Sequence, residues 1–138
     1  KNIDFITIAT LGSAQNFGEL TDDVNHLAGC SNSTRGLFGG GQNPSNVNTI
    51  AYVTIATEGN AIDFGDLAHG GNNGRIDYLG ACASQIRGVI GGGQTPTKIN
   101  TMQFVTISTT GNSTDFGDLT VARRFPMGFS DVHGGLAQ

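Results

Sequence analysis

The sequence predicts an all-β fold made of three similar units, and three observations support this prediction. Nearly the same order of short segments occurs three times along the 138 residues. Several of these segments alternate large apolar residues with small or polar ones, which is the period expected of half-buried strands. Glycine accounts for 22 residues, which fits many tight turns, and no stretch shows sustained helical periodicity.

Each unit contains a variant of the same apolar phrase. It reads FITIAT from Phe5, YVTIAT from Tyr52 and FVTIST from Phe104, at intervals of 47 and 52 residues. Such a period predicts a repeat architecture. We therefore expect one domain, residues 1–138, divided into the repeats 3–49, 50–101 and 102–138.

Four strand-like segments follow one another in a unit. One alternates apolar with polar residues, the next carries a phenylalanine within NFGEL or DFGDL, the third combines apolar and small residues, and the fourth ends in glycines. In that order, we expect strands at residues 3–10, 50–57 and 102–109; around Phe17, Phe64 and Phe116; at 27–31, 79–83 and 127–131; and at 35–41 and 87–93.

This order of segments resembles the kelch family of β-propellers. In VIGGG…NTMQFVTISTTGNSTDFGDLTVARR, a strand ending in glycines precedes a loop and then strands that carry aromatic residues. Phe17, Phe64 and Phe116 stand where that family has Trp, and the third glycine cluster is reduced to HGGLAQ. The sequences of the repeats also resemble kelch-like arrays of bacteriophage and environmental bacterial proteins. The resemblance implies four-stranded antiparallel blades, with glycines letting the inner strands approach and phenylalanines filling the wedges between blades.

The count of repeats raises the question of closure, because propellers have about 4–8 blades. The chain holds three blade-equivalents: two contiguous blades (27–67 and 79–119) and a half-blade at each terminus. We expect residues 127–138 to pair with residues 3–20 of a second copy, so that two chains close a six-bladed ring. The alternatives are a fragment of a longer polypeptide or assembly with a different partner. A β-trefoil or β-prism is the competing three-repeat fold, and the kelch-like order argues against both.

Composition and charge exclude several partners. The net charge is −4, from 7 Lys and Arg against 11 Asp and Glu, and no basic patch predicts contact with nucleic acid. No apolar run reaches the length of a membrane span, so we expect no membrane insertion. The sequence starts at Lys1, as a processed or excised piece would. Cellular location cannot be read from the residues, and the phage resemblance alone favours a virion or the cell exterior.

The motifs that resemble catalytic or ligand-binding motifs are better explained by structural roles, so we expect no catalytic residue, no metal and no cofactor. DFG occurs in repeat register and lacks the other motifs of a kinase. The glycine runs lack the GK[ST] of a phosphate loop. Cys30 and Cys82 share one repeat position, which Phe129 fills in the third unit, and this favours packing over redox chemistry. The equivalent Arg35 and Arg87 predict a repeated structural ion pair or hydrogen bond.

Binding is expected on the loops, where the repeats diverge. The connections 21–26, 68–77 and 120–126, and the loops 42–48 and 94–100, lie on one face in the kelch order and are rich in Asn, Gln, Gly and Arg. These side chains suit hydrogen bonding to a glycan or a polar protein surface. The candidate ligand-binding residues are Asp22, Asp23, His26, Asn43, Asn46, His69, Asn72, Asn73, Arg75, Lys98, Arg123, Arg124 and Phe125.

The sequence therefore favours a non-catalytic binding or assembly module, and the phage resemblance implies a place on a virion or tail. A purely structural scaffold is the alternative. An enzyme of the copper-oxidase or sialidase propeller type is the third and least supported, because the ligand or arginine sets that those enzymes need are not visible.

Overall fold

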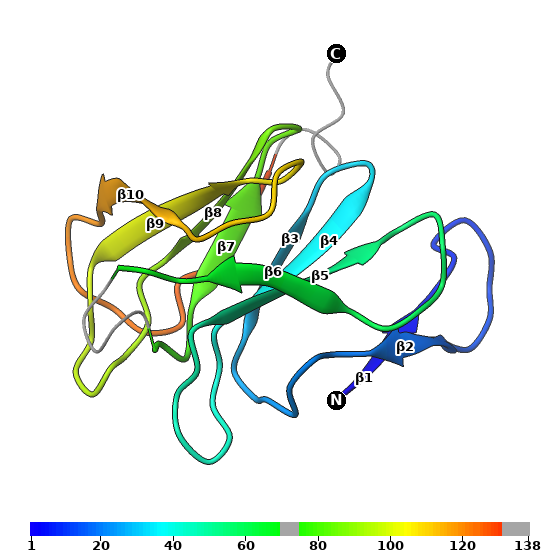
Figure 1. Ribbon diagram of the computed structural model, residues 1–138, viewed down its shortest axis with the longest axis horizontal. Helices are drawn as coiled ribbons and strands as arrows, with labels where there is room; N and C mark the ends of the chain where they lie inside the picture. The colour runs from blue at the N-terminus through cyan, green and yellow to red at the C-terminus, as the bar shows by residue number, and fades with distance from the viewer. Residues whose placement is uncertain (70–74, 131–138) are drawn as a thin grey trace.

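The computed structural model describes residues 1–69 and 75–130, and this part of the chain is all-β without a helix (Figure 1). It contains ten strands in three antiparallel sheets. The strands are β1 (Asn2–Phe5), β2 (Gln15–Glu19), β3 (Ala28–Ser31), β4 (Arg35–Gly39), β5 (Thr49–Thr54), β6 (Ile62–Asp66), β7 (Gly80–Ala83), β8 (Arg87–Gly91), β9 (Thr101–Thr106) and β10 (Thr114–Asp118). The all-β prediction is confirmed.

The sheets repeat one pattern. The middle sheet has the order β3-β4-β5-β6 and the C-terminal sheet the equivalent order β7-β8-β9-β10, while the N-terminal sheet holds only β1 and β2. Their registers also match, since Leu37 faces Tyr52 in one sheet and Val89 faces Phe104 in the other. The sheets stand side by side without closing a ring within the described residues (Figure 1).

The recurring phrase forms a β-bulge. In the middle sheet Ile50 pairs with Gly65 and Ala51 with Asp63, so Phe64 has no residue opposite it. The register shifts at the equivalent point between β1 and β2 and between β9 and β10. Such bulges bend a strand and re-aim a side chain, here at a phenylalanine.

The hydrophobic core lies between the sheets. One cluster joins the middle and C-terminal sheets and includes Leu37, Phe64, Ile90 and Ile107. A smaller cluster around Val53 and Phe38 of the middle sheet joins that sheet to Ile3 and Phe17 of the N-terminal sheet. Full burial of one such side chain stabilises the fold by about 1.5–3 kcal/mol, so the sheets depend on their neighbours for stability.

Close approach of the inner strands explains the glycine clusters. β3 lies beside β7, and a Cβ on Gly88 would come 2.9 Å from the Cys30 Sγ. Gly40 has φ +67° and is packed so closely that its Cβ would lie 2.6 Å from the Ile76 carbonyl oxygen. Only glycine meets both requirements at this point, as the sequence predicted.

The strands are shorter than the apolar alternation suggested. Residues 50–57 were expected to be extended, but β5 ends at Thr54, where the Thr57 N–H donates to the Thr54 carbonyl (3.1 Å) and closes a turn. The apolar pattern continues past the strand because Ile107, at the equivalent place after β9, packs against the neighbouring sheet. Residues 127–130, expected as part of a strand at 127–131, form no strand, although Gly128 lies against the Ala81 carbonyl beside β7. The remainder of that expected half-blade, residues 131–138, lies outside the described residues.

Candidate functional site

Two families of loops meet on one side of the sheets, at the lower edge of Figure 1. The connection before β3 pairs with the β4–β5 loop through Asn25 and Gln42, and the connection before β7 pairs with the β8–β9 loop through Asp77 and Gln94. Because these pairs are backbone bridges, both loop families share a rigid base.

An open cleft of about 810 Å³ lies between these loops. It spans the β4–β5 loop, the end of the connection before β7 and the β8–β9 loop. The side chains that line it are Gln42, Ser45, Asn46, Arg75, Asp77, Tyr78, Gln94, Thr95 and Pro96.

A buried carboxylate forms the polar base of the cleft. Asp77 is 4% exposed, and its Oδ1 accepts a hydrogen bond from the Asn46 Nδ2 (3.0 Å). The same amide donates to the Gln94 carbonyl (3.1 Å), so Asn46 ties the β4–β5 loop to the next repeat. Arg75 is exposed at the same cleft and adds a positive charge near the carboxylate.

Thr95 supplies a polar group whose hydrogen-bonding capacity is unused. Its side chain is buried, with 6% exposure, and its Oγ1 has no hydrogen-bond partner within residues 1–69 and 75–130. A buried hydroxyl without a partner costs about 1–3 kcal/mol. The Thr95 side chain lines the cleft, but its Oγ1 is covered from solvent, so a bound molecule with hydroxyl or carbonyl groups would satisfy it only after the loop around Thr95 shifts.

Three aromatic residues form a row on this side of the sheets, each directly before or near the start of a strand-like segment of its repeat. His26, Tyr78 and Phe125 occupy equivalent repeat positions, and all have φ of 57–58°. The ring centroids of His26 and Tyr78 are 4.1 Å apart, and those of Tyr78 and Phe125 are 4.4 Å apart. The Tyr78 N–H donates to the His26 carbonyl (3.0 Å), and the Phe125 N–H donates to the Tyr78 carbonyl (2.9 Å).

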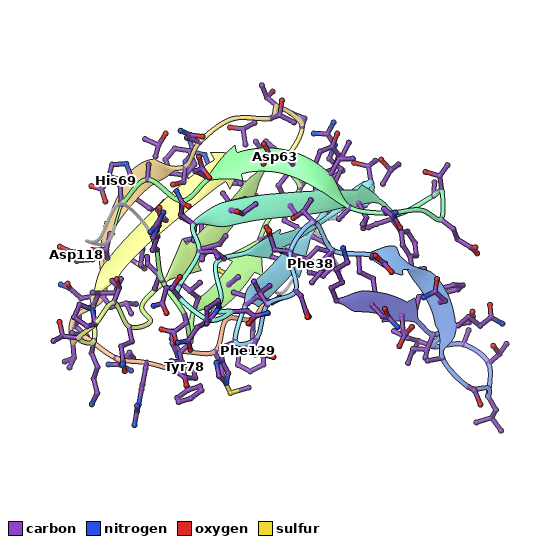
Figure 2. All side chains as sticks on the ribbon, turned by 60° about the horizontal axis from the view of Figure 1, so that its bottom comes forward. Phe38, Asp63, His69, Tyr78, Asp118 and Phe129 are labelled. Carbon is purple, nitrogen blue, oxygen red and sulfur yellow. The ribbon has the colours of Figure 1, made fainter. Side chains whose placement is uncertain are left out.

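Positive φ at bulky residues is an uncommon backbone conformation that costs on the order of 1–3 kcal/mol. Its recurrence shows that each repeat requires it to continue the hydrogen-bonded row. Figure 2 shows Tyr78 at the lower edge of the molecule, away from Asp63 of β6 at the upper edge. The row therefore borders the cleft through Tyr78.

Some of the predicted binding residues belong to this region. Asn46 and Arg75 line the cleft, and His26 and Phe125 flank Tyr78 in the aromatic row. Arg124 stacks its guanidinium 5.8 Å from the Phe125 ring centroid.

Other predicted residues lie elsewhere or act through the backbone. Asp23 accepts a hydrogen bond from the chain's terminal amino group (3.2 Å), and its carbonyl accepts one from the Asn43 side chain (2.6 Å). Asp22 accepts one from the Thr21 hydroxyl (3.2 Å). His69 is held by its backbone against Gln103.

Lys98 forms a backbone bridge with Gln94, and the Arg123 carbonyl accepts the Gly93 N–H (2.8 Å). Asn72 and Asn73 lie outside the described residues. The candidate set therefore divides between the cleft, the aromatic row and separate loop contacts.

Several cleft residues are not among the residues that the sequence predicts to bind. That prediction depends on side chains that differ between repeats, whereas Gln42 and Gln94 are the same residue at one repeat position. Asp77, Tyr78 and Thr95 were omitted because their burial and convergence follow from pairing between loops. The one available signal was the recurrence of Gln directly after GGG.

The remaining motifs have structural contacts. The Arg35 guanidinium donates to the Ile107 carbonyl (2.8 Å) and lies 4.5 Å from the Tyr52 ring centroid, while Arg87 lies 4.6 Å from that of Phe104. Within residues 1–69 and 75–130, the predicted hydrogen bond of the guanidinium is present for Arg35 but not for Arg87, and the contact that both arginines share is stacking on an aromatic ring. Cys30 and Cys82 are free thiols; burial, and to a smaller extent the neighbouring Cys82, raises the pKa of Cys30 to about 12.

Within the described part of the chain, no group of three or more His, Cys, Asp or Glu side chains is placed to hold a metal ion. The same residues include no helix long and apolar enough to cross a membrane. No protein-family model matches the chain, and no curated protein matches it.

Proposed function

We propose that the chain is a three-repeat unit of a kelch-like β-propeller, with half-blades at its two ends and six blades in a ring of two copies. The repeated four-strand order, the adjacent inner strands β3 and β7 and the glycines that permit their approach support this architecture. The two-stranded N-terminal sheet corresponds to the outer half of a blade.

We further propose that this unit is a non-catalytic carbohydrate-binding module, of the kind that a virion or tail displays toward a host surface. The observation that carries the proposal is the buried Thr95 hydroxyl, unpaired among the described residues, in a cleft shared with the Asp77 carboxylate and the Gln42 and Gln94 amides. Sugars present adjacent hydroxyls that both donate and accept hydrogen bonds. A cleft of fixed amides and a carboxylate beside an aromatic residue matches that chemistry.

A glycan array probed with the intact chain tests this function, with hits measured again by calorimetry. Thr95→Val keeps the side-chain shape and removes the hydroxyl, so we expect at least tenfold weaker binding of the selected sugar without loss of fold. Thr110→Val, at an exposed position in the β9–β10 turn, is the matched control and should bind like the parent.

Two results would count against a sugar ligand. One is an array on which no glycan is bound reproducibly. The other is a Thr95→Val chain that binds a selected glycan as tightly as the parent does. An empty array together with a stable closed oligomer would favour the scaffold function instead.

A further inference from the structure

One backbone contact joins the outer strand of a sheet to the following sheet, and we call it the outer-edge contact. In its first occurrence, the Gly59 N–H donates to the Phe17 carbonyl (2.9 Å) and the Ala61 N–H donates to the Glu19 carbonyl (2.8 Å). The Asn60 Oδ1 accepts the Glu19 N–H (3.1 Å). Strand β2, which carries most of NFGEL, is thereby hydrogen-bonded to the Gly-Asn-Ala turn 59–61.

The same contact joins the middle and C-terminal sheets. Gly111 donates to the Phe64 carbonyl (2.7 Å), Ser113 donates to the Asp66 carbonyl (2.9 Å), and Asn112 accepts the Asp66 N–H (3.0 Å). A Cβ on Gly65 would lie 2.5 Å from the Gly111 carbonyl oxygen, so the central glycine of the phrase is required where this contact forms.

Among the described residues, the third copy of the phrase has no such turn beside it, and a Cβ on Gly117 of β10 would meet no atom within 4 Å. At the other end of the chain, Gly12, Ser13 and Ala14 stand at the repeat positions of the Gly-Asn-Ala turn. The chain thus presents an acceptor strand at one end and a donor turn at the other.

The apolar side chains next to these two halves are more exposed than their equivalents between the middle and C-terminal sheets. Phe116 is 48% exposed and Phe64 is 2% exposed. Ile6 and Ile8 are 62% and 94% exposed, whereas the equivalent Val105 and Ile107 are 4% and 0% exposed. The two ends therefore expose the same kind of surface that forms the core between the middle and C-terminal sheets.

We propose that β10 of one copy binds the turn 12–14 of a second copy head to tail, through the outer-edge contact. The interface deepens the proposed propeller architecture and rests on it. Gly12 and Ala14 of the second copy donate to the Phe116 and Asp118 carbonyls, and Ile6 and Ile8 cover Phe116. Figure 2 shows Asp118 at one end of the array and the β1–β2 sheet at the opposite end.

Two further contacts extend across this interface in the same repeat register. Arg87 reaches the Ile8 carbonyl of the second copy, as Arg35 reaches that of Ile107. The row of aromatic rings continues from Phe125 to His26 of a neighbouring copy, as Tyr78 follows His26 within the chain. Because the interface joins two different surfaces, it generates a closed ring when the rotation per copy divides a full turn.

The second copy is favoured as the occupant because both halves belong to this chain and match residue by residue. One adjustment is required at the turn. Gly59 and Gly111 have φ of +153° and +152°, while Gly12 lies outside that region in the structure. Glycine makes this rotation without steric cost, so the turn 12–14 can adopt the docked conformation when it pairs.

Cysteine cross-linking tests the register of the interface. Ser13 corresponds to Asn60 and Asp118 to Glu19, so we mix a Ser13→Cys chain with an Asp118→Cys chain under mild oxidation. We expect a cross-linked dimer in the mixture and not in either chain alone. The doubly substituted Asn60→Cys/Glu19→Cys chain is the internal control, because it should form the same bond within one molecule. The parent chain measures background from Cys30 and Cys82.

Light scattering of the parent chain over a range of concentrations provides a second measurement. We expect a multimer, with Ile8→Asp monomeric and unchanged in circular dichroism. Ile62→Asp changes an exposed isoleucine at a position where the other repeats have Gln15 and Thr114, so it should associate like the parent.

A monomeric parent at all concentrations, or no cross-link in the mixture when the internal control forms one, would overturn the proposed interface. Further repeats on the same polypeptide would then be the occupant of β10. Failure of the internal control would instead contradict the propeller-like sheet contact itself. Sugar binding is measured separately, since the cleft lies within one copy.

Discussion

The glycine of the recurring phrase has the same backbone task in each repeat but different neighbours. Gly65 and Gly117 have φ of +145° and +129°, so a side chain at either position strains the backbone. Of these two glycines, Gly65 lies against the following sheet, at the Gly111 carbonyl, as Gly18 does at the Gly59 carbonyl, whereas Gly117 meets no described atom within 4 Å. The two positions therefore separate the cost of strain from the cost of losing contact between sheets.

We predict that Gly65→Ala lowers the free energy of unfolding by about 3–5 kcal/mol, because strain of about 1–3 kcal/mol adds to overpacking. Gly117→Ala should cost only the strain. Urea denaturation at a concentration low enough to suppress association measures both. Equal losses for the two variants would show that the close approach at Gly65 does not contribute.

The Cys30 thiol predicts a pH dependence of stability. Its pKa is raised to about 12 from an ordinary value of 9.0, mainly by burial. The unfolded thiol begins to ionise near pH 9 while the folded one stays protonated. The stability that this group contributes is therefore complete below pH 9 and is lost as the pH rises toward 12.

Denaturation of the parent and of Cys30→Ala between pH 7 and about pH 11 measures this effect, since the variant lacks the thiol. We expect stability to fall more steeply for the parent above pH 9. Parallel curves would contradict the assignment to Cys30.

At the scale of elements, Gln103 of β9 fixes the outer edge of the neighbouring sheet. Its side chain is fully buried; its Oε1 accepts the N–H groups of Ala68 and His69 (both 3.1 Å), and its Nε2 donates to the His69 carbonyl (2.9 Å). Ser113 also donates to the same Oε1. One side chain thus satisfies the backbone where the chain leaves β6.

Replacing Gln103 with Met should destabilise the fold by about 2–4 kcal/mol, because several buried backbone groups lose their partner. Gln85→Met, at an exposed glutamine, is the control and should stay within about 0.5 kcal/mol of the parent. Chemical denaturation provides the values. A small effect at Gln103 would mean that water or a rearranged Ser113 replaces the amide.

At the scale of the whole molecule, the core lies between successive sheets, so a sheet with an uncovered face is less stable than one covered on both faces. Exposed Ile8 and Phe116 mark the two uncovered faces. The proposed association of copies would cover both faces at once.

We therefore predict that the Tm of the parent chain rises with protein concentration, because binding that favours the folded state stabilises it by mass action. Calorimetry over a hundredfold concentration range measures the shift. The Ile8→Asp chain should melt at a temperature independent of concentration, and a concentration-independent Tm in the parent would contradict association.

The sequence was sufficient to predict the sheets because each strand carries its own signal of alternation and flanking glycines. It also correctly assigned Phe64 to the space between sheets and Arg35 to a structural hydrogen bond, although Arg87 shares only the stacking on an aromatic ring. The strands were predicted to be too long because the apolar alternation continues past their ends. Ile107 lies after β9 and is apolar because it packs against another sheet, and the alternation pattern does not distinguish this cause from strand structure.

The cleft could be predicted only in part. Divergence between loops identified Asn46 and Arg75, whereas Asp77 and Thr95 gain their roles from burial and from bridges between distant loops. The positive φ of His26, Tyr78 and Phe125 could not be predicted either, because bulky residues give no local sign of a left-handed backbone.

The outer-edge contact has a consequence for how such a gene can change. Each unit of roughly 50 residues carries both a donor turn and an acceptor strand, so deletion or duplication of one unit leaves both ends of the polypeptide as they were. In the proposed six-bladed ring, polypeptides of two, three or six units would build rings of the same size from three, two or one molecules. The number of units can then change by duplication or deletion, provided that each unit keeps a turn and a bulged strand able to form the outer-edge contact.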